Sequence, residues 1–321
     1  MAALERNTWI IIVVATALVA AGLWGLSSLT DESPGPSHFT AAATVPPTVE
    51  LARVEAFTPA PVPSGAVDKW SKDDSLATVM ARYREAKDLR VFYDRARQVG
   101  GMANLWAAQT AQLRCQRVGT HGRVAAVQEV IAFAAPMPAD GIEALSQWLQ
   151  PCFGFETQPL PPGEFLAVYR ALRASEGLIG EGYRLSPANR TVPLPEAEQK
   201  EFLRRVVASG EPELIALFGT QAAILRAGPI GRERADGELD FRTPGAIEAS
   251  AWQLAACDLG AHCGPGSEIW LAGCAAGDCG SGAALRGLTA EFDRDTASAI
   301  ARRRDEILAA IKARDWAALG L

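Results

Sequence analysis

Four cysteines and one histidine gather near the C-terminal end of the sequence, in the stretch AACDLGAHCGPGSEIWLAGCAAGDCGSG. Their spacing, C-x5-C-x10-C-x4-C, could serve zinc binding, thiol–disulfide exchange or structural disulfides. Structural zinc sites favour ligand pairs with two to four residues between them, and only the second cysteine pair meets this condition. Thiol–disulfide exchangers use a C-x-x-C pair, which is absent. We therefore expect structural disulfides, with neither a metal nor another cofactor.

Side chains for catalysis are scarce in this sequence. It contains no H-E-x-x-H, G-x-S-x-G, phosphate-binding or dinucleotide-binding motif. A catalytic group near the cysteines could consist of Asp258, His262, Ser267 and Asp278, although only closeness in sequence connects these residues. The catalytic residues thus stay unknown, and Asp258 and His262 are the candidates for a catalytic pair.

An apolar segment near the N-terminus predicts the compartment of the chain. Residues 9–26 contain Thr16 as their only polar side chain. As a helix rising about 1.5 Å per residue, they span roughly 27 Å, close to the hydrocarbon thickness of a bilayer. We predict that residues 1–29 form a transmembrane signal anchor. The alternative is a cleaved signal peptide, although no small-residue cleavage pattern follows the segment.

The charges that flank this segment predict its orientation. Arg6 and the amino terminus precede it, Asp31 and Glu32 follow it, and the next basic residue is Arg53. The positive-inside rule therefore places the N-terminus in the cytoplasm and exports the remainder. We expect a single-pass protein of a bacterial inner membrane, in contact with the lipid bilayer through its N-terminal helix.

The composition changes sharply after the anchor. Residues 30–72 hold seven of the 20 prolines, among Ala, Thr, Ser and Val. Pro-rich segments favour an extended polyproline II conformation, so we predict a spacer. Residues 73–321 then form a periplasmic domain, long enough for one substantial core.

This domain is predicted to be all-α, because apolar residues recur at helical spacing and no segment alternates as a strand does. It would be a disulfide-braced multi-helix bundle or an irregular array of helix pairs. The expected helices cover residues 76–96, 102–118, 123–134, 140–149, 165–172, 267–275 and 288–313, with three more that begin at Pro195, Pro212 and Pro244. Asp73, Asp74 and Ser75 offer N-cap oxygens for the first helix, and a glycine pair ends it.

Two polar stretches remain, one in an expected loop between helices and one within the last expected helix. Residues 176–193, with three glycines among polar side chains, are expected to form a long surface loop. Long ordered loops are often functional, so Glu176, Glu181 and Tyr183 are noted there. The arginine run at residues 302–304 is expected on a solvated helix face.

All six cysteines lie on the exported side, where an even number is typical of disulfides. They are Cys115, Cys152, Cys257, Cys263, Cys274 and Cys279. Cys115 lies near the end of the second expected helix, and Cys152 lies just past the fourth. With one helix between them, these two ends lie on the same side of an up-down-up array. We therefore pair Cys115 with Cys152.

The pairing of the other four cysteines is less constrained, since four cysteines allow three connectivities. A helix over residues 267–275 would separate Cys263 from Cys274 by about 15 Å, whereas a disulfide requires Cα atoms within about 7 Å. This favours the local pairs Cys257–Cys263 and Cys274–Cys279 and leaves the connectivity undecided.

The run CDLGAHCG, together with the CAAGDC pair that follows it, resembles motifs of uncharacterised exported α-helical proteins of Gram-negative bacteria. The resemblance covers about thirty residues. It implies an exported helical protein and brings no activity with it.

The anchor, the spacer and the absence of catalytic motifs lead us to expect a binding or scaffolding module for another envelope protein. Such a role predicts an exposed apolar groove or patch of more than about a few hundred Å². The alternative is an exported hydrolase near the C-terminal cysteines, using His262 with Asp258 or the carboxylates Glu176 and Glu181. A net charge of −6 gives no reason to expect nucleic acid, whose binders carry clustered basic surface.

Overall fold

The computed structural model describes residues 69–122, 125–128, 138–185, 194–233, 239–240, 242–280, 282, 287–289 and 292–321. The predicted anchor, the predicted spacer up to residue 68 and most of the helix expected over 123–134 lie outside these ranges. Within the described ranges, no helix combines the length and apolar character needed to cross a membrane.

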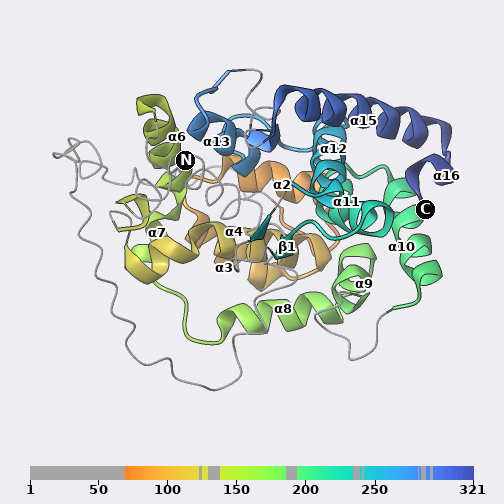
Figure 1. Ribbon diagram of the computed structural model, residues 1–321. Helices are drawn as coiled ribbons and strands as arrows, with labels where there is room; N and C mark the ends of the chain where they lie inside the picture. The colour runs from red at the N-terminus through yellow and green to blue at the C-terminus, as the bar shows by residue number, and fades with distance from the viewer. Residues whose placement is uncertain are drawn as a thin grey trace.

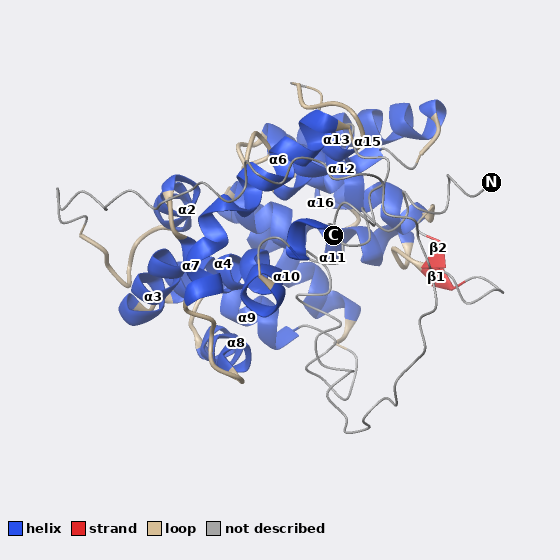
Figure 2. Cartoon of the chain, turned by 90° about the vertical axis from the view of Figure 1, so that its left-hand side faces the viewer, coloured by secondary structure: helices blue, strands red, loops and turns tan. Residues whose placement is uncertain are grey.

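The described fold is all-α, as predicted (Figures 1 and 2). Its helices are α2 (Leu76–Glu85), α3 (Leu89–Val99), α4 (Met102–His121), α6 (Ala139–Leu149), η2 (Gln150–Cys152), α7 (Phe153–Thr157), α8 (Glu164–Ala174), α9 (Leu178–Leu185), α10 (Glu196–Ser209), α11 (Pro212–Ala227), α12 (Pro244–Asp258), α13 (Glu268–Ala275), α15 (Arg294–Ala313) and α16 (Trp316–Leu319). Sheet structure in the described part is one antiparallel pair of two-residue strands, β1 (Arg232–Glu233) and β2 (Leu239–Asp240).

Two groups of helices share one hydrophobic core. In the first group, α4 packs against α2, α3, α6, α7, α8 and α9. In the second, α11 packs against α10 and α12, and α12 packs against α15. Figure 1 shows α15 along the upper edge of the molecule and α8 along the lower edge. The buried core runs through both groups, from Leu89 and Tyr93 to Trp252 and Ile307.

The folded part begins before residue 73. Trp70 packs on Phe92 with their ring centroids 5.3 Å apart, and the guanidinium of Arg82 lies over the Trp70 ring. Residues 69–72, which the composition assigned to the spacer, are therefore packed on the helical domain.

The first expected helix is two helices in the structure, α2 and α3. The Asp88 carboxylate accepts the N–H groups of Arg90 (2.7 Å) and Val91 (3.2 Å), and Ala86 is extended with a ψ of 124°. An N-capping aspartate starts a new helix here while the apolar spacing continues across the break. The prediction of a single helix over residues 76–96 is therefore wrong.

The glycine pair expected to end this run does so. Gly100 follows α3 and Gly101 precedes α4, with φ values of 71° and 81°. Only glycine adopts such values without strain, and a Cβ on Gly101 would overlap the backbone carbonyl of Lys72. The turn between α3 and α4 therefore depends on this pair.

Most predicted helix starts agree with the structure. Pro212 and Pro244 are the first residues of α11 and α12, and Pro195 precedes α10, since proline suits a position that needs no N–H. The last long helix, α15, starts later than predicted. Its first residue follows the N-cap Asp293, whereas the prediction began the helix at residue 288.

A helix also lies where a surface loop was predicted, over the first half of residues 176–193. In α9, Ile179 is fully buried. Gly182 packs so closely on Phe218 of α11 that an added Cβ would overlap the phenyl ring. Glycine weakens a helix by intrinsic propensity, but here it permits two helices to approach, so the loop prediction is wrong for this half.

Three disulfides brace the domain. Their Cα–Cα distances are 5.1 Å for Cys115–Cys152, 5.5 Å for Cys257–Cys263 and 4.3 Å for Cys274–Cys279. The first ties α4 to η2 at the end of α6, and the other two close short local loops. The pairing inferred from helix order and the favoured local pairs are thereby confirmed.

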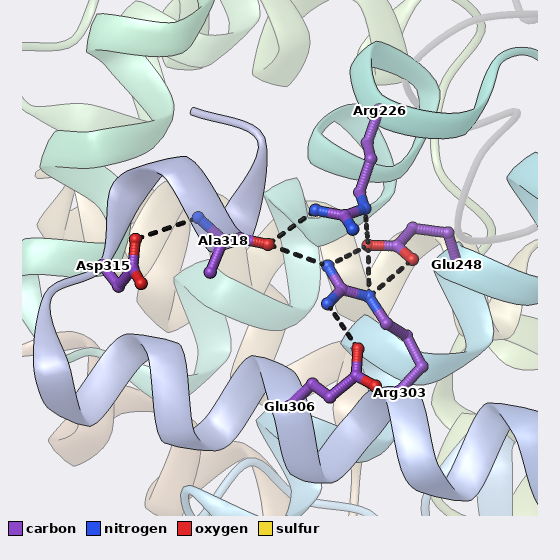
Figure 3. A network of polar contacts seen from close by, with 6 residues as sticks. All are labelled: Arg226, Glu248, Arg303, Glu306, Asp315 and Ala318. Atoms are coloured by element: carbon purple, nitrogen blue, oxygen red, sulfur yellow. Dashed lines mark hydrogen bonds and ion pairs between the residues drawn. The ribbon is translucent and has the colours of Figure 1, made fainter.

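A network of charges holds the C-terminal end of the chain (Figure 3). Glu248 of α12 accepts hydrogen bonds from Nε and Nη2 of Arg303, each 2.8 Å long, and Arg226 Nε lies 3.6 Å from the same carboxylate. Both arginines also donate to the Ala318 carbonyl of α16. The Arg303 side chain is 12% exposed, so the predicted solvated face is wrong for this arginine.

Candidate functional site

A cleft of about 230 Å³ lies between the α4 group and the α11–α12 group. Its walls come from α2, α4, α6, α9, α11, α12, α13 and the loop before α13. Five aromatic side chains line it: Tyr83, Trp106, Trp148, Tyr183 and Phe218. We call this feature the aromatic cleft.

Helical spacing presents one face of α4 and one face of α11 to the cleft. On α4 the lining residues are Trp106, Gln109, Thr110 and Leu113. On α11 the strip consists of Glu213, Ala216, Leu217, Thr220 and Gln221, with Phe218 beside it. Residues three and four apart lie on the same side of a helix, so each set forms a continuous strip along one wall.

The Cys257–Cys263 disulfide positions the loop that closes one end of the cleft. It joins the last turn of α12 to the loop before α13. Ala261, His262 and Cys263 of this loop line the cleft. The cysteine cluster thus has a structural part in building the site.

Glu268, in the first turn of α13, brings a carboxyl group into the lining. Its Oε2 is buried and accepts no hydrogen bond from the described residues. Burial raises the pKa of this carboxyl to about 7, against the lowering effect of the Arg114 charge. The carboxyl is therefore poised to change its charge near neutral pH.

Arg114 lies near Glu268, but its guanidinium makes its hydrogen bonds with other groups. Its guanidinium stacks over the rings of Trp148 (4.8 Å) and Tyr83 (5.9 Å). Its Nε donates to the Trp148 carbonyl at 3.1 Å. Arg114 therefore acts on Glu268 through its field and leaves the carboxyl without a direct partner.

Glu213 and His262 form a second polar pair in the lining. The Glu213 carboxylate accepts the backbone N–H of His262 at 3.3 Å and pairs with Arg84 at 3.4 Å. Burial raises the pKa of Glu213. Burial, reinforced by the charges of Arg84 and Arg114, lowers the pKa of His262, so its imidazole is neutral at neutral pH.

An amide group from α4, that of Gln109, also belongs to the polar lining. The Tyr183 hydroxyl donates to Gln109 Oε1, and burial raises the pKa of this tyrosine. Gln109 Nε2 is buried, with no acceptor among the described residues. Within the described chain, Gln109 Nε2 is therefore an unpaired buried donor in the cleft lining, as Glu268 Oε2 is an unpaired buried acceptor.

The structure separates the residues predicted around the cysteines. His262 and Ser267 line the cleft, whereas Asp258 and Asp278 do not. Asp258 lies on the α15 side and pairs with Arg304 at 3.4 Å. The Ser267 hydroxyl is used as the N-cap of α13, so no described contact joins His262 to Asp258 or activates Ser267.

The three residues noted in the predicted loop are also separated. Glu181 pairs with Arg205, and Glu176 is exposed. Neither lines the cleft, whereas Tyr183 does.

Sequence reasoning missed Glu268, Glu213 and Gln109. Glu268 directly follows Ser267, where the helix was expected to begin, and an acidic residue in the first turn of a helix is common because it favours the helix dipole. Its burial depends on α4 and α6, which lie far away in sequence. Among the described residues, no three His, Cys, Asp or Glu side chains are grouped so as to hold a metal ion.

Raising the pH from about 5 to about 8 is expected to lower the free energy of unfolding by about 2–3 kcal/mol through Glu268 alone. Its pKa is about 7 in the folded chain, against an ordinary value of 4.5. The folded chain therefore retains a proton that the unfolded chain has released. This stabilisation is complete below about pH 4.5 and is lost as the pH rises through about 7.

The measurement is chemical unfolding of the full chain at several pH values, for the native sequence and for Glu268→Gln. Glu213 also has a raised pKa and therefore also makes the folded chain less stable as the pH rises. Because Glu213 is present in both proteins, the difference between their pH dependences reports the contribution of Glu268. Coinciding pH dependences for the two proteins would contradict the prediction.

Comparisons with protein-family models, with curated proteins and with solved structures find no match for this chain.

Proposed function

We propose that this chain is a membrane-tethered periplasmic binding module whose aromatic cleft receives an apolar group from another envelope component. The apolar segment at residues 9–26 and the Pro-rich stretch after it support a tether. The three disulfides support an oxidising compartment, where such bonds persist.

The observation that carries the binding role is the gathering of aromatic side chains in the cleft. Elsewhere on the described residues, the exposed large hydrophobic side chains are Val91 (57%) and Leu259 (37%). Single exposed hydrophobic residues are normal on protein surfaces and do not form a docking patch. The aromatic cleft therefore takes the place of the broad apolar patch expected from the sequence.

The size of the cleft limits its occupant. Small-molecule sites usually measure roughly 300–1,000 Å³, and this cleft measures about 230 Å³. A ring or short alkyl chain fits this space, so the occupant is a side-chain-sized group, presented by a partner or carried by a small molecule.

Filling the cleft is expected to weaken the binding of benzyl alcohol, a neutral probe of suitable size, at least about tenfold. Ala216 lines the cleft on α11, and Ala216→Phe would place a ring in the space that the probe needs. Binding is measured by calorimetry on the full chain in lipid nanodiscs, with empty nanodiscs as the reference.

The matched control is Ala208→Phe, which adds the same ring at an exposed position of α10. This control is expected to bind benzyl alcohol like the native chain. Equal binding by both variants, or no binding by the native chain, would refute the role proposed for the cleft.

Exported hydrolysis is the second proposal, and one observation favours it. Glu268, whose pKa lies near 7, lines the same cleft as the neutral His262, and carboxyl groups tuned in this way act as general acids. Asp258 has no part in this version, because it pairs with Arg304. Turnover of chromogenic esters or glycosides that survives Asp258→Asn and disappears in Glu268→Gln would favour it.

A further inference from the structure

A buried carboxyl group in the aromatic cleft has no partner within the described chain. Glu268 Oε2 is shielded from solvent and accepts no hydrogen bond there. Buried polar groups in native proteins are nearly always hydrogen-bonded, and leaving one unsatisfied costs stability. The group lines a cleft large enough for a ligand, so the missing donor can come from a bound molecule.

The nearby cations are already engaged. Arg114 of α4 donates to the Trp148 carbonyl, and Arg84 of α2 pairs with Glu213 of α11. His262, in the loop before α13, is neutral because burial lowers its pKa. None of these groups forms an ion pair with Glu268.

The remaining titratable groups near α13 do not supply a partner either. Tyr83 of α2 stays protonated, since burial raises its pKa. Asp140 and Glu143 of α6, the helix packed on α13, are exposed and carry the same charge sign as Glu268. None of the described groups around α13 therefore forms an ion pair with Glu268 when its carboxyl is ionised.

We propose that the aromatic cleft selects an organic ammonium group, with the charged nitrogen on Glu268 and the apolar body among the aromatic rings. The ammonium proposal rests on the proposed binding function and adds the class of ligand that the aromatic cleft would bind. Hydrogen bonds to an ionised partner are roughly twice as strong as neutral ones. Rings such as Trp106 and Phe218 line the same cleft and offer apolar contact to the body of the ligand.

Benzylammonium and benzyl alcohol test this selectivity, because they share a ring and differ in the charged group. With the full chain in nanodiscs at about pH 8, benzylammonium is expected to bind at least about tenfold more tightly. At about pH 5 the preference is expected to shrink to less than about threefold, because Glu268, with a pKa of about 7, is then protonated.

Glu268→Gln is expected to bind the two probes equally at both pH values, because it removes the group that receives the positive charge. The matched control is Glu143→Gln, which removes an exposed carboxylate from α6 and is expected to keep the full preference. This pair separates a direct contact from a general change in net charge.

The failures of the two proposals are distinguishable. Equal binding of both probes to the native chain at about pH 8 overturns the ammonium selectivity and leaves the apolar binding role standing. A preference that persists in Glu268→Gln also overturns it, since another group would then receive the charge. Absence of binding by both probes overturns the binding role and this inference together.

Discussion

Replacing Glu248 with alanine is expected to lower the free energy of unfolding by about 3–5 kcal/mol. The Glu248 side chain is 8% exposed, and its carboxylate receives the guanidinium of Arg303, which is 12% exposed. Removing one partner of a buried pair leaves the other charge poorly compensated, and here Arg303 would keep only the exposed Glu306 as an ion-pair partner among the described residues. Chemical denaturation of the full chain, followed by circular dichroism, measures the loss.

Two further variants test whether burial is the cause. Glu306→Ala removes a second partner of Arg303 that is 64% exposed, and exposed pairs contribute about 0–1 kcal/mol. Replacing Glu248 and Arg303 together by methionine removes both buried charges, so it is expected to be much less harmful than Glu248→Ala. If Glu248→Ala cost no more than Glu306→Ala, the structural importance of this network would be refuted.

Replacing both Cys115 and Cys152 with alanine is expected to cost about 4 kcal/mol of unfolding free energy. The two cysteines are 37 residues apart in sequence, so their disulfide restricts a long loop in the unfolded chain. The corresponding double variant of Cys257 and Cys263, which are only 6 residues apart, is expected to cost about 2 kcal/mol.

The comparison is made by chemical denaturation under non-reducing conditions. Each double variant removes two sulfur atoms as well as a disulfide, so part of each stability loss comes from lost packing. The informative result is therefore which of the two losses is larger. A larger loss for the short loop than for the long one would contradict the loop-entropy explanation.

The cleft alters the binding role that the sequence led us to expect. The prediction required exposed apolar surface, and the described exterior has two isolated large hydrophobic side chains, Val91 and Leu259. The apolar side chains converge instead on a recess whose polar groups include Glu268 and Gln109. Recognition by such a recess depends on a fitted chemical group more than on a large contact area.

Features that depend on short stretches of sequence could be predicted. The all-α class follows from apolar periodicity, and the starts of α11 and α12 follow from Pro212 and Pro244. Spacing favoured the local disulfides, because a short helix keeps Cys263 and Cys274 apart, but it left their connectivity undecided until the structure showed it. Even Cys115–Cys152 required only the order of consecutive helices.

Features that depend on contacts between distant segments could not be predicted. α9 is helical where its glycines suggested a loop, because Gly182 lets it pack on Phe218. Arg303 is buried because Glu248, 55 residues away, lies opposite it. The surroundings of Glu268 come from α4 and α6, and those of His262 include Arg84 of α2. Periodicity and capping act over a few residues, whereas burial and charge pairing are properties of the packed chain, so the site became visible only in three dimensions.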